Sequence, residues 1–303
     1  LGWGVQGALF GQIVGGLLSL LPGYYLIRLS FGLRFNLLSF RQMLAFSVPL
    51  VPSSLGVVLA TYFDRIALKE LMSLSDVGVY AVAQKISLVI TLIMIGFRSA
   101  LTPLIYVNYK LDTTPSDLAK VFNLFCFSAM TMLLMISIFA NEVVNIMSAA
   151  AFEDAAKVIP LLSFSVLLAN MYIFAPGLDI YKRTGLISLI NVAAAIISVS
   201  LNYILIPYFG IIGAALSSLT AFGLSFMVYM IFSQKLYPVP HNWILVLRLT
   251  SITVLVIYFV NVLHYVWQVH LITKALIFIG TLFLLMHIVG FSSYKSLRNF
   301  LKF

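Results

Sequence analysis

Polar side chains gather on one face of a long apolar segment, residues 78–107. Taken at about 100° per residue from Tyr80, they fall within roughly 60° of arc, and they are Gln84, Ser87, Thr91, Arg98 and Thr102. Arg98 lies deep in this segment, where a charge costs ~2.5–3.5 kcal/mol on insertion scales. It should therefore face a wet cavity or a charged partner. A guanidinium binds phosphate with two parallel hydrogen bonds, so this face could hold an anionic ligand.

Two further segments carry polar faces. Residues 43–68 place Ser47, Ser54, Thr61 and Arg65 on one face with Asp64 beside it, and residues 186–206 align Ser188, Asn191, Ser198 and Asn202. Three such faces suggest a water-filled central cavity. Hydroxyls and amides also join neighbouring helices, at ~0.6–2 kcal/mol each. That second explanation is favoured for residues 186–206, and the cavity is favoured for Arg98.

The remaining charges inside the apolar segments are few. Lys85 lies about 140° from the polar face of residues 78–107, so it either extends to the interface or lines a second side of the cavity. Asp179 precedes Lys182 and Arg183 by three and four residues, a spacing that predicts a local ion pair.

The sequence lacks the residue patterns that several kinds of chemistry require. The single cysteine, Cys126, excludes a disulfide framework or a thiolate metal site, and the four histidines lack ligand spacing. There is no phosphate-binding glycine loop and no Ser/His/Asp or paired-carboxylate arrangement. We therefore expect no catalytic residue, no cofactor and no metal, and the chain is not expected to be an enzyme.

The elements that position these residues follow from composition. Only 9% of the 303 residues are charged, 62% are hydrophobic, and the mean hydropathy is +1.09. A soluble domain carries about 25% charged residues, and a spanning helix needs ~20 apolar residues. The chain is predicted to be an all-α polytopic membrane protein. Its nine predicted spans are residues 3–27, 43–68, 78–107, 118–140, 156–181, 186–206, 211–232, 243–263 and 272–289.

The distribution of Lys and Arg predicts the orientation. One set of alternate loops and the tail hold Arg28, Arg34, Arg41, Lys110, Lys120, Lys182, Arg183, Lys235, Arg248, Lys295, Arg298 and Lys302. The other set holds Arg65, Lys69, Lys157 and Lys274, together with acids such as Asp76, Glu142 and Glu153. Basic loops stay in the cytoplasm. The C-terminus is therefore predicted to be cytoplasmic, and the net charge of +9 is a topology signal, so no nucleic-acid partner is expected.

A short internal repeat predicts two lobes. Residues 4–9 read GVQGAL and residues 210–215 read GIIGAA, each followed by a long apolar helix. Residues 1–28 then form the last helix of an N-terminal lobe whose other helices lie outside this sequence. Residues 40–236 form a six-helix C-terminal lobe, and residues 243–293 an accessory helix pair. On this basis the chain holds nine of about fourteen helices. Small residues also let helices pack closely in lipid, which explains the motif without a repeat.

Two blocks of sequence resemble a known family. Residues 201–215 read LNYILIPYFGIIGAA, similar to the LN-x-x-LIP-x-x-G-x-x-GAA signature of Wzx-type polysaccharide flippases. Residues 46–50 read FSVPL, Asp64-Arg65 follows, and residues 77–86 read VGVYAVAQKI, also as in that family. These are O-antigen exporters of the multidrug/oligosaccharidyl-lipid/polysaccharide exporter superfamily. The resemblance implies a two-lobed, MATE-like helical bundle.

The resemblance also implies a function. Such proteins flip oligosaccharides linked to undecaprenyl diphosphate across the bacterial inner membrane by alternating access, for O-antigen, capsule or exopolysaccharide synthesis. Membrane lipid, a polysaccharide polymerase and a chain-length regulator are the implied partners. Residues 43–68 and 78–107 would line the cavity. The candidate substrate-binding residues are Arg98, Arg65, Lys85, Asp64, Gln84, Thr91, Ser87 and Thr61.

Two alternatives remain at this point. A MATE-like cation-coupled exporter of small molecules would need an acidic cavity, whereas the deep charge here is Arg98. A membrane-embedded polysaccharide polymerase or ligase would need a large outer loop rich in Arg and His, which the sequence lacks.

Overall fold

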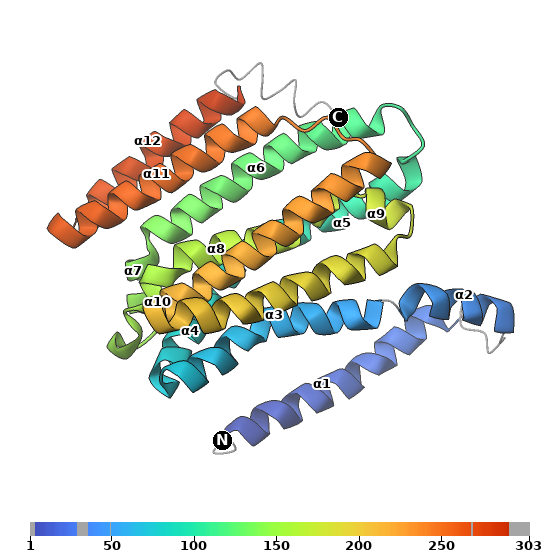
Figure 1. The fold of residues 1–303 in the computed structure, drawn as a ribbon, viewed down its shortest axis with the longest axis horizontal. Coiled ribbons are helices and arrows are strands. Elements are labelled where there is room, and N and C mark those ends of the chain that lie inside the picture. The colour runs from blue at the N-terminus through green and yellow to red at the C-terminus, as the bar shows by residue number, and fades with distance from the viewer. Residues whose placement is uncertain (1–3, 29–35, 49, 268, 291–303) are drawn as a thin grey trace. The chain divides into compact units, whose positions relative to one another are not determined.

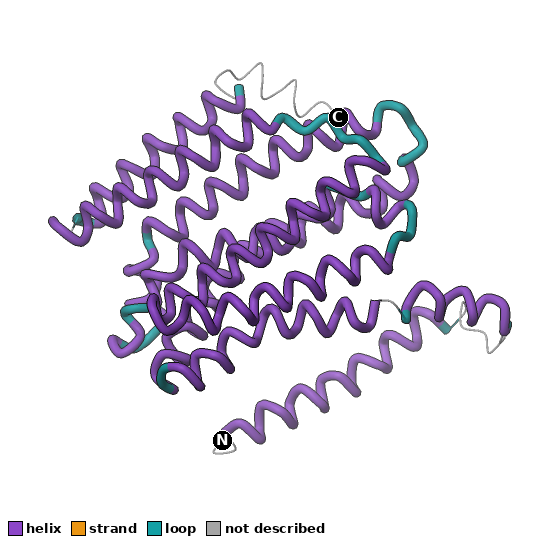
Figure 2. The backbone as a smooth tube through the Cα atoms, viewed as in Figure 1, coloured by secondary structure: helices purple, strands orange, loops and turns teal. Residues whose placement is uncertain are grey.

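The chain is helical along almost its whole described length. The computed structural model describes residues 4–28, 36–48, 50–267 and 269–290. Within these ranges there are helices and short turns but no strand (Figure 2). Seven of the described helices are long and apolar enough to cross a membrane. The prediction of an all-α polytopic membrane protein is thereby confirmed.

The seven helices correspond to eight of the nine predicted spans, and the ninth, residues 43–68, is not among them. The longest helix, α10 (Thr184–Leu236), has 53 residues and is broken at Gly210, so it contains two of the predicted spans. The predicted break between residues 206 and 211 is thus confirmed. Helix α3 (Leu50–Leu71) has a suitable length but is not among the seven. Its second half contains Asp64, Arg65, Lys69 and Glu70, which lower its hydropathy.

Three predicted spans are interrupted. Residues 43–68 divide between α2 (Leu37–Ser47) and α3. Residues 78–107 divide into α4 (Leu74–Ser87), a 3₁₀ turn η1 (Leu88–Ile90) and α5 (Thr91–Asn108). Residues 156–181 divide into α8 (Ala155–Asn170), the 3₁₀ turn η3 (Met171–Phe174) and α9 (Gly177–Ile180). Pro176 precedes α9 and has no N–H with which to continue the preceding helix.

The chain divides into two compact units, residues 1–45 and 46–303. The first contains α1 (Gly4–Ile27), an apolar helix with Pro22 near its end, and most of α2. The side chain of Asn36 starts α2 by accepting a hydrogen bond of 2.9 Å from the Leu38 N–H. The second unit contains the rest of the chain, and all sites described below belong to it.

Helices α10 and α3 pack against each other in the second unit. The two halves of α10 fold back on each other at Gly210 (φ 57°, ψ −134°) (Figure 1). Such a conformation is essentially restricted to glycine. A Cβ on Gly213 would lie 2.4 Å from the Leu205 carbonyl oxygen, so only glycine permits this close approach. Helix α10 packs against α3, α8 and α9, and α4 packs against α8 and α3. The GIIGA motif therefore forms a turn between two helices.

The last two helices lie beside α6. Helix α6 (Thr114–Ile138) is followed by the short α7 (Ala140–Met147) and the turn η2 (Ala150–Phe152), within a predicted loop. Helices α11 (Trp243–Trp267) and α12 (Leu271–Val289) both pack on α6 and on each other (Figure 1). The Lys274 ammonium of α12 is 1% exposed and lies 2.8 Å from Glu142 of α7. An ion pair thus fixes the start of α12.

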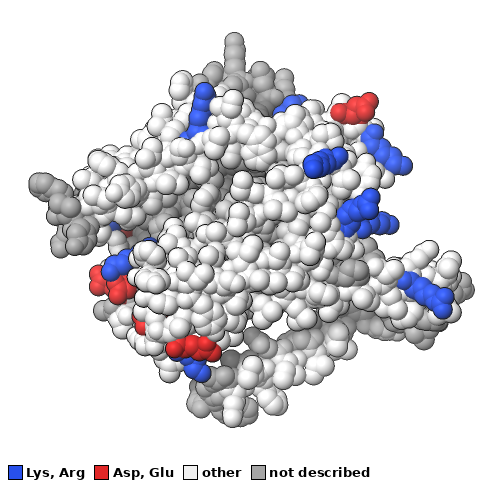
Figure 3. All heavy atoms as spheres, in the orientation of Figure 1, with Lys and Arg blue, Asp and Glu red and all other residues white. Residues whose placement is uncertain are grey.

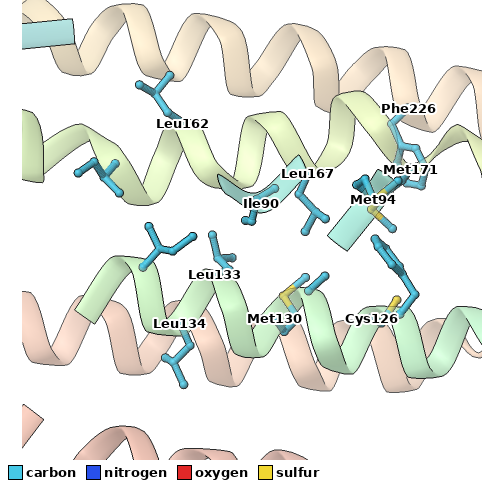
Figure 4. Close-up of a cluster of buried hydrophobic side chains, with 14 of the residues drawn as sticks. Ile90, Met94, Cys126, Met130, Leu133, Leu134, Leu162, Leu167, Met171 and Phe226 are labelled. Carbon is cyan, nitrogen blue, oxygen red and sulfur yellow. The ribbon is translucent and has the colours of Figure 1, made fainter. Parts of the chain in front are cut away.

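A continuous apolar core joins the two sides of the bundle. Figure 4 shows buried side chains from the α4–α5 region, α6, α8, η3 and α10, many of which point into the space between α6 and α8. The labelled residues are Ile90, Met94, Cys126, Met130, Leu133, Leu134, Leu162, Leu167, Met171 and Phe226. These contacts fix α4 and α5, which carry most of the candidate site residues.

Candidate functional site

A single carboxylate joins four helical segments. Asp64 of α3 is 1% exposed and accepts hydrogen bonds from the Tyr80 hydroxyl (2.6 Å), the Asn202 amide (2.7 Å) and the Ser218 hydroxyl. Tyr80 belongs to α4, and Asn202 and Ser218 lie about two turns on either side of Gly210. A buried carboxylate without such donors would cost several kcal/mol. In this conformation the Asp64 carboxylate is inaccessible to a ligand.

The neighbouring residue, Arg65, points to α4. Its Nε and Nη2 atoms donate to the Gln84 side-chain oxygen at 3.1 and 2.6 Å, and its guanidinium lies 5.4 Å from the centre of the Tyr62 ring. Gln84 is buried and Arg65 is half-buried. Two of the predicted site residues are therefore brought together as a hydrogen-bonded pair.

The polar face of residues 78–107 divides in two. In α4, Ser87 is fully buried and donates to the carbonyls of Ala83 (2.9 Å) and Ile159 (3.3 Å), so it joins α4 to α8. At the start of α5, Thr91 donates to the Leu88 carbonyl at 2.6 Å. These residues, with Tyr80 and Gln84, lie within the bundle. The α4 part of this face consists of interhelical contacts.

The α5 part of the same face is open. Arg98 is exposed, and within the described residues its guanidinium has no hydrogen bond and no carboxylate within 4 Å. One turn beyond Arg98, Thr102 donates to the Arg98 carbonyl at 2.7 Å. Arg98 is thus a cation inside a span, not neutralised by a contacting acid.

Asp179 of α9 has a different partner from the one predicted. It accepts a hydrogen bond of 2.9 Å from the Tyr229 hydroxyl of α10. The Tyr229 ring lies 4.5 Å from that of Tyr172, centroid to centroid. The predicted ion pair with Lys182 or Arg183 is wrong, because the chain turns between α9 and α10 and neither cation lies within 4 Å of the carboxylate.

The last candidates lie apart. Lys85 is exposed on α4, with no ion pair among the described residues. Thr61 lies in α3, but its side chain is outside the described part of the structure. Of the third polar face, Asn202 reaches Asp64, which confirms an interhelical role there. Ser198 is fully buried, and its hydroxyl has no partner among the described atoms.

Sequence reasoning missed two features of this region. It placed Asp64 beside a polar face and among the substrate-binding candidates, whereas the Asp64 carboxylate is 1% exposed and is bonded inside the bundle. It also missed Ser218, two turns after Gly210, as a donor to the same carboxylate. Ser218 follows Gly210 by the same number of residues by which Asn202 precedes it, and this symmetry about the glycine turn is the signal that identifies it.

Comparison with known proteins gives two matches. Residues 1–108 match the family described as polysaccharide biosynthesis protein. The chain is 23% identical over 197 residues to the probable low-salt glycan biosynthesis flippase Agl15 of Haloferax volcanii, covering 62% of this chain and 41% of that protein. The chain thus spans about two fifths of the length of this relative. No solved structure shows a significant match. The chain is therefore similar to polysaccharide biosynthesis proteins and to a glycan flippase, and residues 1–108, which match the family, include Asp64 and Arg98.

Proposed function

We propose that this chain is part of a flippase that moves oligosaccharide repeat units on undecaprenyl diphosphate across the bacterial inner membrane. The translocated repeat units would be used for O-antigen, capsule or exopolysaccharide synthesis. Support comes from the polytopic helical fold and from the similarity to polysaccharide biosynthesis proteins and a glycan flippase. We propose that the partners of this protein are the polysaccharide polymerase and the chain-length regulator of the same biosynthetic pathway.

The observation that carries this proposal is Arg98. It lies within a span, is exposed, and has no contacting acid among the described residues. A diphosphate and sugar hydroxyls must cross ~30 Å of hydrocarbon, so a transporter has to replace their hydration. The guanidinium matches a phosphate bidentately, and the exposed side chains of Tyr106 and Asp179 offer hydrogen-bonding groups to the sugar.

The other candidate residues take different roles in this proposal. Lys85, exposed one helix earlier, is a second cation for the same ligand. Arg65 donates two hydrogen bonds to Gln84, and this contact holds α3 against α4. Asp64 and Ser87 fix the helices around the proposed cavity, whereas Thr91 bonds only to the Leu88 carbonyl in its own segment. The proposed substrate contacts therefore concentrate on Arg98 and Lys85.

The proposed mechanism is alternating access. The spans between residues 46 and 236 would move as one lobe around the bound headgroup, while the lipid tail stays in the bilayer. The pair α11 and α12 would remain attached to this lobe through α6 and the Lys274–Glu142 ion pair. The C-terminus would lie in the cytoplasm, because most of the Lys and Arg share its side.

An exporter of organic cations is the competing proposal, and Asp64 is the observation that bears on it. Such a transporter needs an accessible acid, and Asp64 is an acid inside the bundle. Its carboxylate is 1% exposed and already accepts three hydrogen bonds. The accessible cations, Arg98 and Lys85, have the opposite sign, and the exposed acid Asp179 already accepts a hydrogen bond from Tyr229. The anionic substrate is therefore the better match.

The test uses the full-length protein in its own cells, with the chromosomal copy deleted. Arg98→Ala should abolish surface polysaccharide while the protein stays in the membrane at its normal level. Arg98→Lys should retain part of the export, because charge matters more than the guanidinium geometry. Arg248→Ala is the matched control, because it removes an exposed arginine of α11 and should leave export normal.

A second arm separates substrate binding from an ion pair within the lobe. If Arg98 served only to neutralise Asp179, then Asp179→Asn would reproduce the loss seen with Arg98→Ala. We expect Asp179→Asn to be clearly milder. Normal export by a well-expressed Arg98→Ala protein would reject the proposed substrate contact.

A further inference from the structure

An open basic pocket lies at the end of the bundle where α9 is joined to α10. Its volume is about 550 Å³, and its walls come from two segments that are far apart in sequence. Lys182, Arg183 and Thr184 form one side, and Phe232 and Lys235 from the end of α10 form the other. Figure 3 shows basic side chains gathering at this end of the unit. The pocket thus combines three cations with an apolar wall.

Lys182 has a left-handed backbone conformation, which is unfavourable for a lysine. Lys182 has φ 53° and is the one non-glycine residue with positive φ in the described part of the chain. The Lys182 N–H donates to the Asp179 carbonyl (3.1 Å) and the Arg183 N–H to the Leu178 carbonyl (2.9 Å). This is the Schellman motif that ends a helix, in which the left-handed position is usually glycine. A lysine at this position destabilises the turn relative to glycine.

The three cations are not neutralised within the described residues. None of Lys182, Arg183 and Lys235 lies within 4 Å of a carboxylate there. Asp179 is bound by Tyr229, and the ammonium of Lys235 lies 5.7 Å from the centre of the Phe232 ring. Helix α10 begins at this pocket with no acidic residue in its first turn and no side-chain cap. The positive end of its dipole therefore adds to the field.

We propose that this pocket binds the phosphate of an anionic phospholipid headgroup, and that Lys182 is retained in its strained conformation for that purpose. Phe232 and Leu236 give the acyl chains an apolar surface beside the cations. A free anion would gain nothing from that surface. The same end carries the basic residues that place it in the cytoplasm, where the leaflet is rich in anionic lipid. The site is independent of the sugar substrate proposed above.

The experiment exploits the opposite effects that Lys182→Gly should have on folding and on binding. The purified full-length protein in a neutral detergent is titrated with short-chain phosphatidylglycerol, and its thermal midpoint is followed. Without lipid, Lys182→Gly should melt at the same temperature as wild type or higher, because glycine relieves the left-handed turn. Its apparent affinity for phosphatidylglycerol should be about fivefold weaker, as expected for one lost cation at a membrane surface.

Two further variants and two control ligands make the result decisive. Lys235→Ala should weaken the affinity to a similar extent without touching the strained turn. Lys120→Ala, which removes an exposed lysine that pairs with Asp117, should leave the affinity unchanged. Phosphatidylcholine and inorganic phosphate should give no shift in the thermal midpoint.

Three outcomes would overturn the proposal. Unchanged phosphatidylglycerol affinity in both Lys182→Gly and Lys235→Ala would place lipid binding elsewhere. An equal shift with inorganic phosphate would make the pocket a site for a free anion. Saturation by geranyl diphosphate at much lower concentration than phosphatidylglycerol would make it an entry site for the transported lipid diphosphate instead.

Discussion

At the scale of residues, Asp64 is an acid that lies inside the helix bundle but is not accessible to a ligand. Three donors from α4 and from the two halves of α10 meet its carboxylate. The next residue, Arg65, turns away and binds Gln84. Adjacent opposite charges thus serve two separate helix contacts. Arg98 and Lys85 are the exposed cations of α4 and α5.

The Asp64 cluster predicts a large loss of stability on truncation. Asp64→Ala leaves three buried donors without an acceptor, at about 1–3 kcal/mol each, so the total should be about 3 kcal/mol or more. Ser218→Ala removes one donor and should cost about 1 kcal/mol. Unfolding of the purified protein in mixed micelles, followed by circular dichroism, gives both values.

Glu70 supplies the matched control for that measurement. It also joins α3 to α10 through a tyrosine hydroxyl, since Tyr203 donates to it at 2.8 Å, but the pair is exposed. Glu70→Ala should therefore cost less than about 0.5 kcal/mol. Equal losses for Asp64→Ala and Glu70→Ala would contradict the importance assigned to burial.

At the scale of elements, the decisive feature is the turn inside α10. Gly210 supplies a backbone conformation that other residues avoid, and Gly213 lets two helices cross at backbone contact. The turn brings Asn202 and Ser218 to the same depth, so both reach Asp64. A short glycine motif thereby determines the geometry of a site two turns away.

Alanine substitutions test this directly. Gly210→Ala should cost about 1–2 kcal/mol through its left-handed φ, and Gly213→Ala should cost at least as much, because its Cβ meets the Leu205 carbonyl. Gly223→Ala lies in the same helix, and its Cβ would meet Leu168 at an ordinary 3.7 Å. It should be neutral or slightly stabilising. Thermal midpoints of the three variants, measured together, check the order, and a neutral Gly213→Ala would contradict the close crossing.

At the scale of the whole molecule, charge marks the two ends of the bundle. Lys274 and Glu142, which the sequence assigned to the same side, form an ion pair across α12 and α7. On the face seen in Figure 3, several basic side chains gather at the other end, where α9 is joined to α10. The direction of this asymmetry in the membrane remains a prediction from the distribution of Lys and Arg.

Single cysteines placed in a Cys126→Ser protein test that orientation. Positions 76 and 153 should react with an impermeant thiol reagent in intact cells, and position 182 should react only after the cells are opened. Arg34 would be a further cytoplasmic position, although it lies outside the described residues. Labelling of position 182 without position 153 in intact cells would reverse the topology, and with it the leaflet assigned to the basic pocket.

The sequence by itself determined the class of the protein, because sparse charge and long apolar segments permit only helices in lipid. It also located the break near Gly210, since the motif itself encodes the turn. Only the tertiary structure decided which polar residues meet. Helical periodicity assigned Gln84, Ser87 and Arg98 to one face, but it carries no information about what that face contacts. The partners of Asp64 come from residues 16 to 154 positions away, and Asp179 meets Tyr229 and not the cations beside it in sequence. Such pairings depend on how the helices pack, which no local pattern specifies.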